Sequence, residues 1–161
     1  MFLASSTPAA RPLRLPPPIS LEAALAPRGI DAERFASFVS AFRHSGGLAS
    51  SDEVVRLLRG HVDQPISLLA RWIVTRQALS FTWQSCTLLP MFQFDRSDMS
   101  LRDGAAQVVR ELRAAFDDWD LASWFAQPNS WLHGAAPVDA IGHDLSAVLQ
   151  AARADRFIAI G

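Results

Sequence analysis

Helix start and stop signals divide this sequence into short segments, and they limit its possible folds more than any other feature. Pro65 suits the first turn of a helix, and the pair Gly46-Gly47 suits the end of one. Between such signals apolar residues recur every three or four positions, which predicts amphipathic helices. The predicted helices cover residues 20–26, 31–45, 51–59, 65–78, 104–116, 119–126 and 144–156, with Ser20, Asp31, Asp117-Asp118 and Asp144 as N-caps.

The apolar period changes between residues 80 and 94, where it becomes typical of short strands. We expect two strands joined by residues 84–87. Pro90 in the second strand predicts an edge or a bulge, because proline cannot donate a ladder hydrogen bond. Residues 157–161 are expected to form a short strand or an ordered tail. The predicted fold class is mainly α: a helical bundle with a small two-stranded β-hairpin.

Three parts are expected along the chain. Residues 1–18 contain five prolines and no apolar period, which predicts a flexible, extended arm. Residues 19–94 are expected to contain the N-terminal helices and a winged-helix-like unit. Residues 95–161 are expected to form a separate helical module.

The composition excludes several classes of protein. The 161 residues carry 15 basic and 16 acidic side chains and are 50% apolar, which argues against general disorder and against a strongly basic nucleic-acid coat. No apolar stretch approaches the roughly 18 residues of a membrane helix, and the first residues lack the order of a secretory signal. Cys86 is the single cysteine, so no internal disulfide can form. We therefore expect a cytoplasmic protein without a membrane partner.

No pattern typical of catalysis or of a cofactor site occurs. The chain lacks GxSxG, GxGxxG and HExxH, and it has no lysine for a P-loop or a Schiff base. Its four histidines have no metal-ligand spacing, and Cys86 is predicted to act as a small, buried or half-buried hydrophobe. The acidic run Asp117-Asp118-Asp120 is predicted to cap a helix. These patterns predict a protein that is not an enzyme and holds neither cofactor nor metal.

Residues 51–94 have the order of a winged helix-turn-helix: a helix, a break, a second helix and a hairpin. The second helix would read DNA. Its side chains able to contact phosphates or base edges are Gln64, Ser67, Arg71, Thr75 and Arg76. Residues 47–94 hold only four arginines against three acids, so a monomer would bind DNA weakly. The same helix pair could instead serve packing or dimerisation.

The C-terminal half carries a longer motif. Residues 90–95 read P-x-FQFD, and a W…A..W…PN..L.G..P…L pattern follows, matched by Trp119, Ala122, Trp124, Pro128, Asn129, Leu132, Gly134, Pro137 and Ile141. In this order and spacing, residues 88–157 resemble the Xre/MbcA/ParS toxin-binding domain family. The N-terminal half shows no motif of the usual Xre helix-turn-helix.

The resemblance implies an antitoxin of a bacterial type II toxin–antitoxin pair. Members commonly neutralise a RES-domain toxin, which consumes NAD or modifies proteins with its ADP-ribose part. They do so by covering the toxin's active-site entrance with their C-terminal domain. An N-terminal helix-turn-helix often mediates dimerisation and promoter binding in the family. The expected partners are therefore a cognate toxin, promoter DNA and a second copy of the chain. The expected toxin-binding residues are Pro128, Asn129, Trp131, Leu132, Gly134, Pro137, Arg153 and Arg156.

Two assignments stay open at this level. Trp131 could anchor an interface or belong to the core. Arg153 and Arg156 could face acidic or phosphate-binding groups of a toxin pocket, or lie on a solvated helix face. The alternative function is a DNA-binding transcriptional regulator with no toxin partner.

Overall fold

The computed structural model describes residues 30–161, so the predicted arm (1–18) and the predicted helix 20–26 lie outside the described residues. The described chain is mainly helical, as expected, and contains a small antiparallel sheet. Its α-helices are α2 (Ile30–Phe42), α3 (Ser51–Leu58), α4 (Pro65–Val74), α5 (Asp103–Leu112), α6 (Asp118–Ala126), α7 (Pro137–Ala140) and α8 (Leu145–Ile160). The strands are β1 (Leu48–Ser50), β2 (Phe81–Trp83) and β3 (Cys86–Pro90), and 3-10 turns cover Arg43–Ser45, Met91–Gln93 and Ser130–Leu132.

The sheet has one strand more than the expected hairpin. β2 and β3 do form a hairpin, and Gln84 and Ser85 at its turn both adopt the positive φ angles that tight two-residue turns require. β1 pairs with the other side of β3, which gives the order β1-β3-β2, so the prediction of a two-stranded hairpin is wrong. Pro90 therefore lies in the central strand and not on an edge. It is the last residue of β3, and the following Met91 N–H donates to Gly47.

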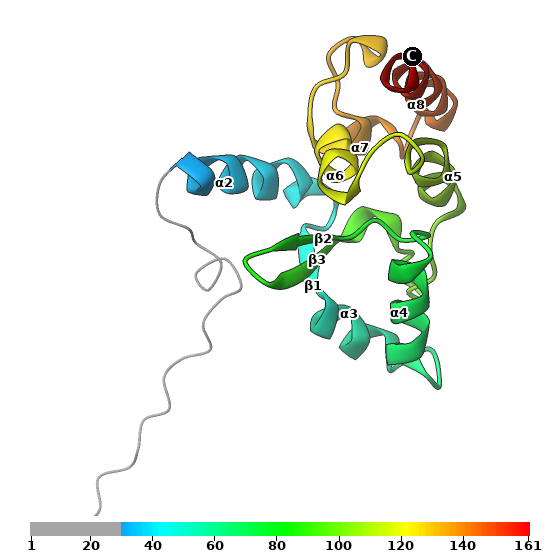
Figure 1. The fold of residues 1–161 in the computed structure, drawn as a ribbon. Coiled ribbons are helices and arrows are strands. Elements are labelled where there is room, and N and C mark those ends of the chain that lie inside the picture. The colour runs from blue at the N-terminus through cyan, green and yellow to red at the C-terminus, as the bar shows by residue number, and fades with distance from the viewer. Residues whose placement is uncertain (1–29) are drawn as a thin grey trace, which may run out of the picture.

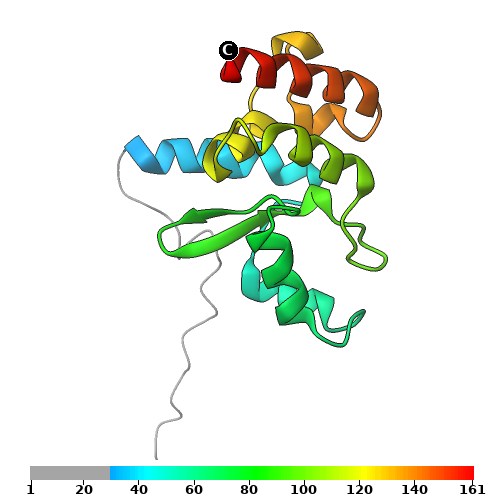
Figure 2. The ribbon, with the colours of Figure 1, turned by 45° about the vertical axis from the view of Figure 1, so that its right-hand side comes forward.

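The sheet separates two layers of helices and two apolar cores. Figure 1 and Figure 2 show α3 and α4 on one side of it and α2, α5, α6 and α8 on the other. Side chains alternate across β3 accordingly. Leu88 enters the larger core with α2, α5, α6 and α8, whereas Leu89 enters the smaller core with α3 and α4. The larger core combines residues from both sides of residue 94, including Phe42, Val108 and Phe125.

Side-chain caps begin two of the C-terminal helices, as the sequence indicates. The Asp117 carboxylate accepts a hydrogen bond from the backbone N–H of Asp120 at 2.8 Å, and Asp144 caps α8 in the same way. Both predicted N-caps are confirmed. Asp31 is not an N-cap, because α2 already begins at Ile30.

Several helix ends differ from the prediction. α4 stops at Val74 and not at residue 78, because Arg76 takes a left-handed backbone conformation with φ 52°. α5 ends at Leu112 and not at residue 116. Residues 157–161 form neither a strand nor a tail: α8 continues to Ile160, since no glycine or proline interrupts it before Gly161. This extension adds exposed apolar side chains to the end of α8.

The P-x-FQFD segment joins the two cores. Phe92 lies in the larger core and Phe94 in the smaller one, with the buried Gln93 between them. The Gln93 amide accepts from the Leu79 N–H at 2.7 Å and donates to the carbonyls of Leu79 at 2.8 Å and Pro90 at 2.9 Å. These bonds fix the chain that enters β2 against the end of β3.

A candidate protein-binding surface around the end of α8

The loop at residues 128–136 contains most of the predicted binding residues, and its own hydrogen bonds hold it closed. The Asn129 side-chain oxygen accepts from the Trp131 N–H at 2.9 Å. The Asn129 N–H donates to the Ala135 carbonyl at 3.0 Å, and the Gly134 N–H donates to the Asn129 carbonyl at 2.9 Å. Gly134 has a φ of 86°, a conformation that side-chain-bearing residues rarely adopt. The loop is thus a fixed element of the surface.

The structure divides the predicted loop residues into a buried and an exposed group. Leu132, Pro137 and the side chain of Asn129 are buried, so they shape the loop from inside. Pro128 and Trp131 reach the surface. Because Trp131 is exposed, it does not belong to the core.

Asp155 of α8 ties the loop to that helix. Its Oδ2 accepts hydrogen bonds from Trp124 Nε1 and Asn129 Nδ2, both at 2.8 Å, and its Oδ1 accepts from Trp131 Nε1 at 3.0 Å. No ion pair within residues 30–161 involves Asp155, so the described protein groups that bind its carboxylate are all neutral donors. The network fixes the Trp131 ring beside the last turns of α8.

The two predicted arginines of α8 contact α5. Arg153 Nε and Arg156 Nη1 both pair with the carboxylate of Glu111, at 3.2 and 2.9 Å. Both arginine side chains remain exposed, and ion pairs of this kind contribute little to stability. Both guanidinium groups are therefore accessible to a partner. One carboxylate faces two cations, which leaves this side of α8 positively charged.

The last turns of α8 expose large apolar side chains. Phe157 is 77%, Ile158 67% and Ile160 61% exposed, and Trp131 is 54% exposed. Ile158 follows Asp155 by one helical turn, so it lies on the side of α8 that meets Trp131. Phe157 and Ile160, two and five residues after Asp155, lie on other sides of the same helix end. We name the exposed residues around this end of α8, which are Trp131, Phe157, Ile158 and Ile160, the α8-end patch. Aromatic and aliphatic side chains exposed together on a rigid element are typical of protein interfaces.

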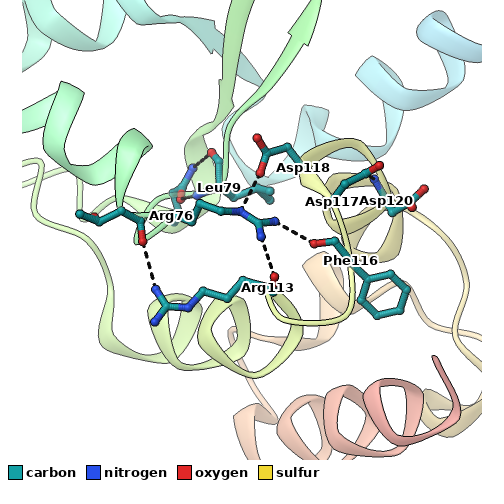
Figure 3. A network of polar contacts seen from close by, with 9 residues as sticks. Arg76, Leu79, Arg113, Phe116, Asp117, Asp118 and Asp120 are labelled. Carbon is teal, nitrogen blue, oxygen red and sulfur yellow. Dashed lines mark hydrogen bonds and ion pairs between the residues drawn. The ribbon is translucent and has the colours of Figure 1, made fainter. Parts of the chain in front are cut away.

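The candidate DNA-contacting residues fall into two groups. Gln64, Ser67 and Arg71 are exposed along α4 and at its N-cap, where a large partner can reach them. Arg76 extends instead into the junction between α4 and the chain that links α5 to α6, as Figure 3 shows. The Thr75 hydroxyl donates to the Arg71 carbonyl within its own helix.

Arg76 binds several groups in that junction. Its Nε contacts Asp118 Oδ1 at 3.0 Å, and its two terminal nitrogens donate to the carbonyls of Arg113 at 2.6 Å and Phe116 at 2.8 Å. Arg113 Nη1 donates in return to the Thr75 carbonyl at 3.1 Å. Arg76 therefore fastens α4 to the C-terminal helices, and its guanidinium group is not free for a phosphate.

Replacing Arg76 with alanine is expected to lower the free energy of unfolding by about 1–2 kcal/mol, because two carbonyls and a carboxylate lose a charged donor. The effect stays modest because the Arg76 side chain is 34% exposed and water can reach the vacated groups. Urea unfolding followed by circular dichroism measures this change. Arg71→Ala is the matched control, since it removes an exposed arginine from α4, the helix that ends just before Arg76, and should change stability by under about 0.5 kcal/mol. Equal effects of the two substitutions would contradict a role for the junction.

The described residues were also searched for groups that could bind a metal ion and for a reactive thiol. Within residues 30–161, no group of three or more His, Cys, Asp or Glu side chains could hold a metal ion. Cys86 lies partly buried in β3, and this burial, with the nearby carboxylates of Asp52 and Glu53, raises the pKa of its thiol. A raised pKa lowers the thiolate fraction and with it the reactivity of the cysteine.

No helix in the described residues is long and apolar enough to cross a membrane.

No family model matches the chain, and comparison with curated proteins and solved structures finds no significant match. The function must therefore be inferred from the surfaces described above.

Proposed function

We propose that this protein is an antitoxin, a non-enzymatic protein that neutralises a toxin by stoichiometric binding. The α8-end patch would cover the entrance to the toxin's active site, with Arg153 and Arg156 contacting acidic groups at its rim. The expected toxin is an NAD-consuming enzyme of the RES class, because residues 88–157 resemble the toxin-binding domains that act on such enzymes.

The observation that carries the proposal is the exposure of the α8-end patch. Large side chains such as Phe157 and Ile158 are more than half exposed in the chain alone, and burying each one stabilises a complex by about 1.5–3 kcal/mol. The partner would not have to order a flexible loop, since the Asp155 network already holds Trp131 in place. Such preorganisation lowers the entropic cost of binding.

Co-expression with the product of the neighbouring reading frame tests the proposal. The neighbour alone should arrest growth, and this chain should restore growth and co-purify with it. Phe157→Glu and Ile158→Glu should each weaken the complex by about 30-fold or more, because residues at the centre of an interface commonly contribute about 2 kcal/mol or more. Isothermal titration calorimetry on the purified proteins measures the affinities.

Val74→Glu is the matched control for these substitutions. Val74 is an exposed apolar residue at the end of α4, outside the α8-end patch, so this variant should bind the toxin as the wild type does. A harmless neighbour that fails to co-purify would refute the antitoxin proposal. A complex that tolerates both patch substitutions would place the interface elsewhere.

A DNA-binding regulator without a toxin is the second candidate, and the order of the elements favours it. α2, β1, α3, α4, β2 and β3 follow one another as in a winged helix-turn-helix, and the sheet order is β1-β3-β2. One feature departs from that scheme, because α2 packs with the C-terminal helices, across the sheet from α3 and α4. A salt-dependent shift of its own promoter fragment by the protein alone would favour this candidate.

A further inference from the structure

A pocket of about 500 Å³ lies beside α3, bounded by three segments that are distant from one another in sequence. α3 forms one wall, the chain that follows β3 forms another, and Gly46 with β1 completes the pocket. This volume falls in the range of about 300–1,000 Å³ that is typical of pockets for small ligands. Ala49 and Met99 in its lining belong to the smaller core, so the pocket lies across the sheet from α8 (Figure 1) and is separate from the α8-end patch.

Apolar side chains form much of the pocket wall. Those of Ala49 and Met99 are buried, and those of Leu48 and Met91 are half-buried. Leu57 is 48% exposed and belongs to neither core, so the folding of the chain does not account for this apolar side chain. Together these side chains can cover the hydrocarbon part of a ligand, whose removal from water favours binding.

Two arginines at this pocket have no ionic partner. Arg56 comes from α3 and Arg96 from the chain after β3, and both are exposed. Neither takes part in an ion pair within residues 30–161. A guanidinium group binds a carboxylate or a phosphate through two parallel hydrogen bonds. The pocket therefore offers strong donors for an anionic group next to an apolar wall.

Glu53 is the third charged residue of the lining. Its Oε2 accepts hydrogen bonds from the Ser50 N–H at 2.7 Å and from the Ser50 hydroxyl at 3.1 Å, so this carboxylate belongs to the cap of α3. Two arginines against one glutamate give the lining a formal net charge of +1. This charge matches a ligand with a single negative charge.

The local backbone holds Arg96 at the pocket. A Cβ on Gly46 would lie 2.7 Å from Arg96 Nη2, so the guanidinium group rests on the glycine backbone in a space that a side chain would occupy. Arg96 extends from a closed loop, in which the Asp95 N–H donates to the Ser100 carbonyl at 2.8 Å and the Met99 N–H donates to the Asp95 carbonyl at 2.7 Å. A donor that is already in place lowers the entropic cost of binding.

We propose that this pocket binds a small amphipathic carboxylate, a molecule with one carboxylate group and a hydrocarbon body. Arg56 and Arg96 hold the carboxylate, and the apolar wall covers the hydrocarbon body. A phosphate monoester carries about 1.5 to 2 negative charges at neutral pH, which exceeds the net charge of the lining. A DNA phosphate would occupy the arginines but leave the apolar wall in water. The inference holds whether or not the chain binds a toxin.

The methionines provide a direct measurement of binding at this site. The chain has three of them, and two, Met91 and Met99, line the pocket. In the full chain labelled with ¹³C at the methionine methyl groups, octanoate should shift the NMR signals of Met91 and Met99 until they saturate and leave the Met1 signal unchanged. 1-Octanol has a tail of the same length but no charge, so it should bind at least about tenfold more weakly.

Substitution of the two arginines tests how the ligand is held. Arg56→Gln and Arg96→Gln should each lower the affinity for octanoate at least about fivefold and leave the affinity for 1-octanol unchanged. The preference for the acid over the alcohol then falls, which a folding defect alone does not produce. Arg59→Gln is the matched control, because it removes an exposed arginine directly after α3 that does not line this pocket.

Three results would overturn the inference. For a ligand of this size we expect a Kd of about 1 mM, so unchanged Met91 and Met99 signals at about 10 mM octanoate would exclude the site. Equal affinities for octanoate and 1-octanol, or full octanoate binding by the variant with both substitutions, would exclude the role of Arg56 and Arg96. Tighter binding of octyl phosphate than of octanoate would replace the carboxylate with a phosphate ester.

Discussion

Replacing Gln93 with leucine is expected to lower the free energy of unfolding by about 3–5 kcal/mol. Gln93 is only 1% exposed, and its amide bonds to the backbone of Leu79 and Pro90. Leucine has a similar volume but leaves one N–H and two carbonyls without their partner, and each buried unpaired group costs about 1–3 kcal/mol. Urea unfolding measures the loss. Gln77→Leu, at an exposed glutamine, is the control and should change stability by under about 0.5 kcal/mol.

Gln93→Glu tests the same contacts through their pH dependence. At neutral pH a carboxylate would face the carbonyls of Leu79 and Pro90, so repulsion and burial should raise its pKa in the folded state. The folded variant then binds more protons than the unfolded one, and its stability relative to the wild type should fall as the pH rises. At low pH the protonated acid can donate where the amide did. A stability difference that does not change with pH would contradict this assignment.

The helices were predictable wherever a few adjacent residues determine them. Pro65, Asp117 and Asp144 begin helices because a missing N–H or a capping carboxylate acts locally. β1 was not predictable in this way. Its three residues are too few to show an apolar period, and it forms only because β3 pairs with it from far along the chain. The pairing of β1 with β3 also explains why Pro90 is the last residue of a central strand, although a proline in a strand predicts an edge strand when the sequence is considered by itself.

The candidate surface was predictable only in part. Trp131 stood out as an aromatic residue in a loop. Asp155 did not, because its three donors lie 24 to 31 residues away in sequence and meet it only in the folded chain. The residues at 157–160 were missed because a short apolar run has no period that distinguishes a strand from a helix. Tertiary contacts therefore decide most of the proposed binding surface.

Replacing Asp155 with alanine is expected to lower the free energy of unfolding by about 2–4 kcal/mol, because hydrogen bonds to a charged acceptor contribute about 1.5–3 kcal/mol each and Asp155 is only partly buried. The substitution leaves the buried Asn129 amide and the Trp124 indole without an acceptor. Urea unfolding measures the loss. Asp139→Ala, at an exposed aspartate of α7, is the control and should stay within about 0.5 kcal/mol of the wild type.

Asp155→Asn separates the position of Trp131 from overall stability. All three partners of Asp155 are donors, and asparagine keeps a single acceptor oxygen. When the asparagine oxygen accepts from Trp124 and Asn129, its NH₂ group faces the Trp131 indole N–H, and two donors cannot bond to each other. The Trp131 ring should therefore lose its hydrogen bond to α8, whereas Asn129 still joins the loop to the helix. Ordering a released side chain again costs about 0.5–1.5 kcal/mol on binding. The affinity for the proposed toxin should therefore fall about three- to tenfold.

A double-mutant cycle decides whether Asp155 acts through Trp131. Phenylalanine at position 131 has no N–H to donate, so Asp155→Asn should weaken binding of the proposed toxin much less in the Trp131→Phe background than in the wild type. Additive effects of the two substitutions would contradict the positioning role. Coupling between the two substitutions would mean that Asp155 acts on binding through Trp131. The three donors to the Asp155 carboxylate would then hold the loop and the end of α8 in one arrangement before the partner binds.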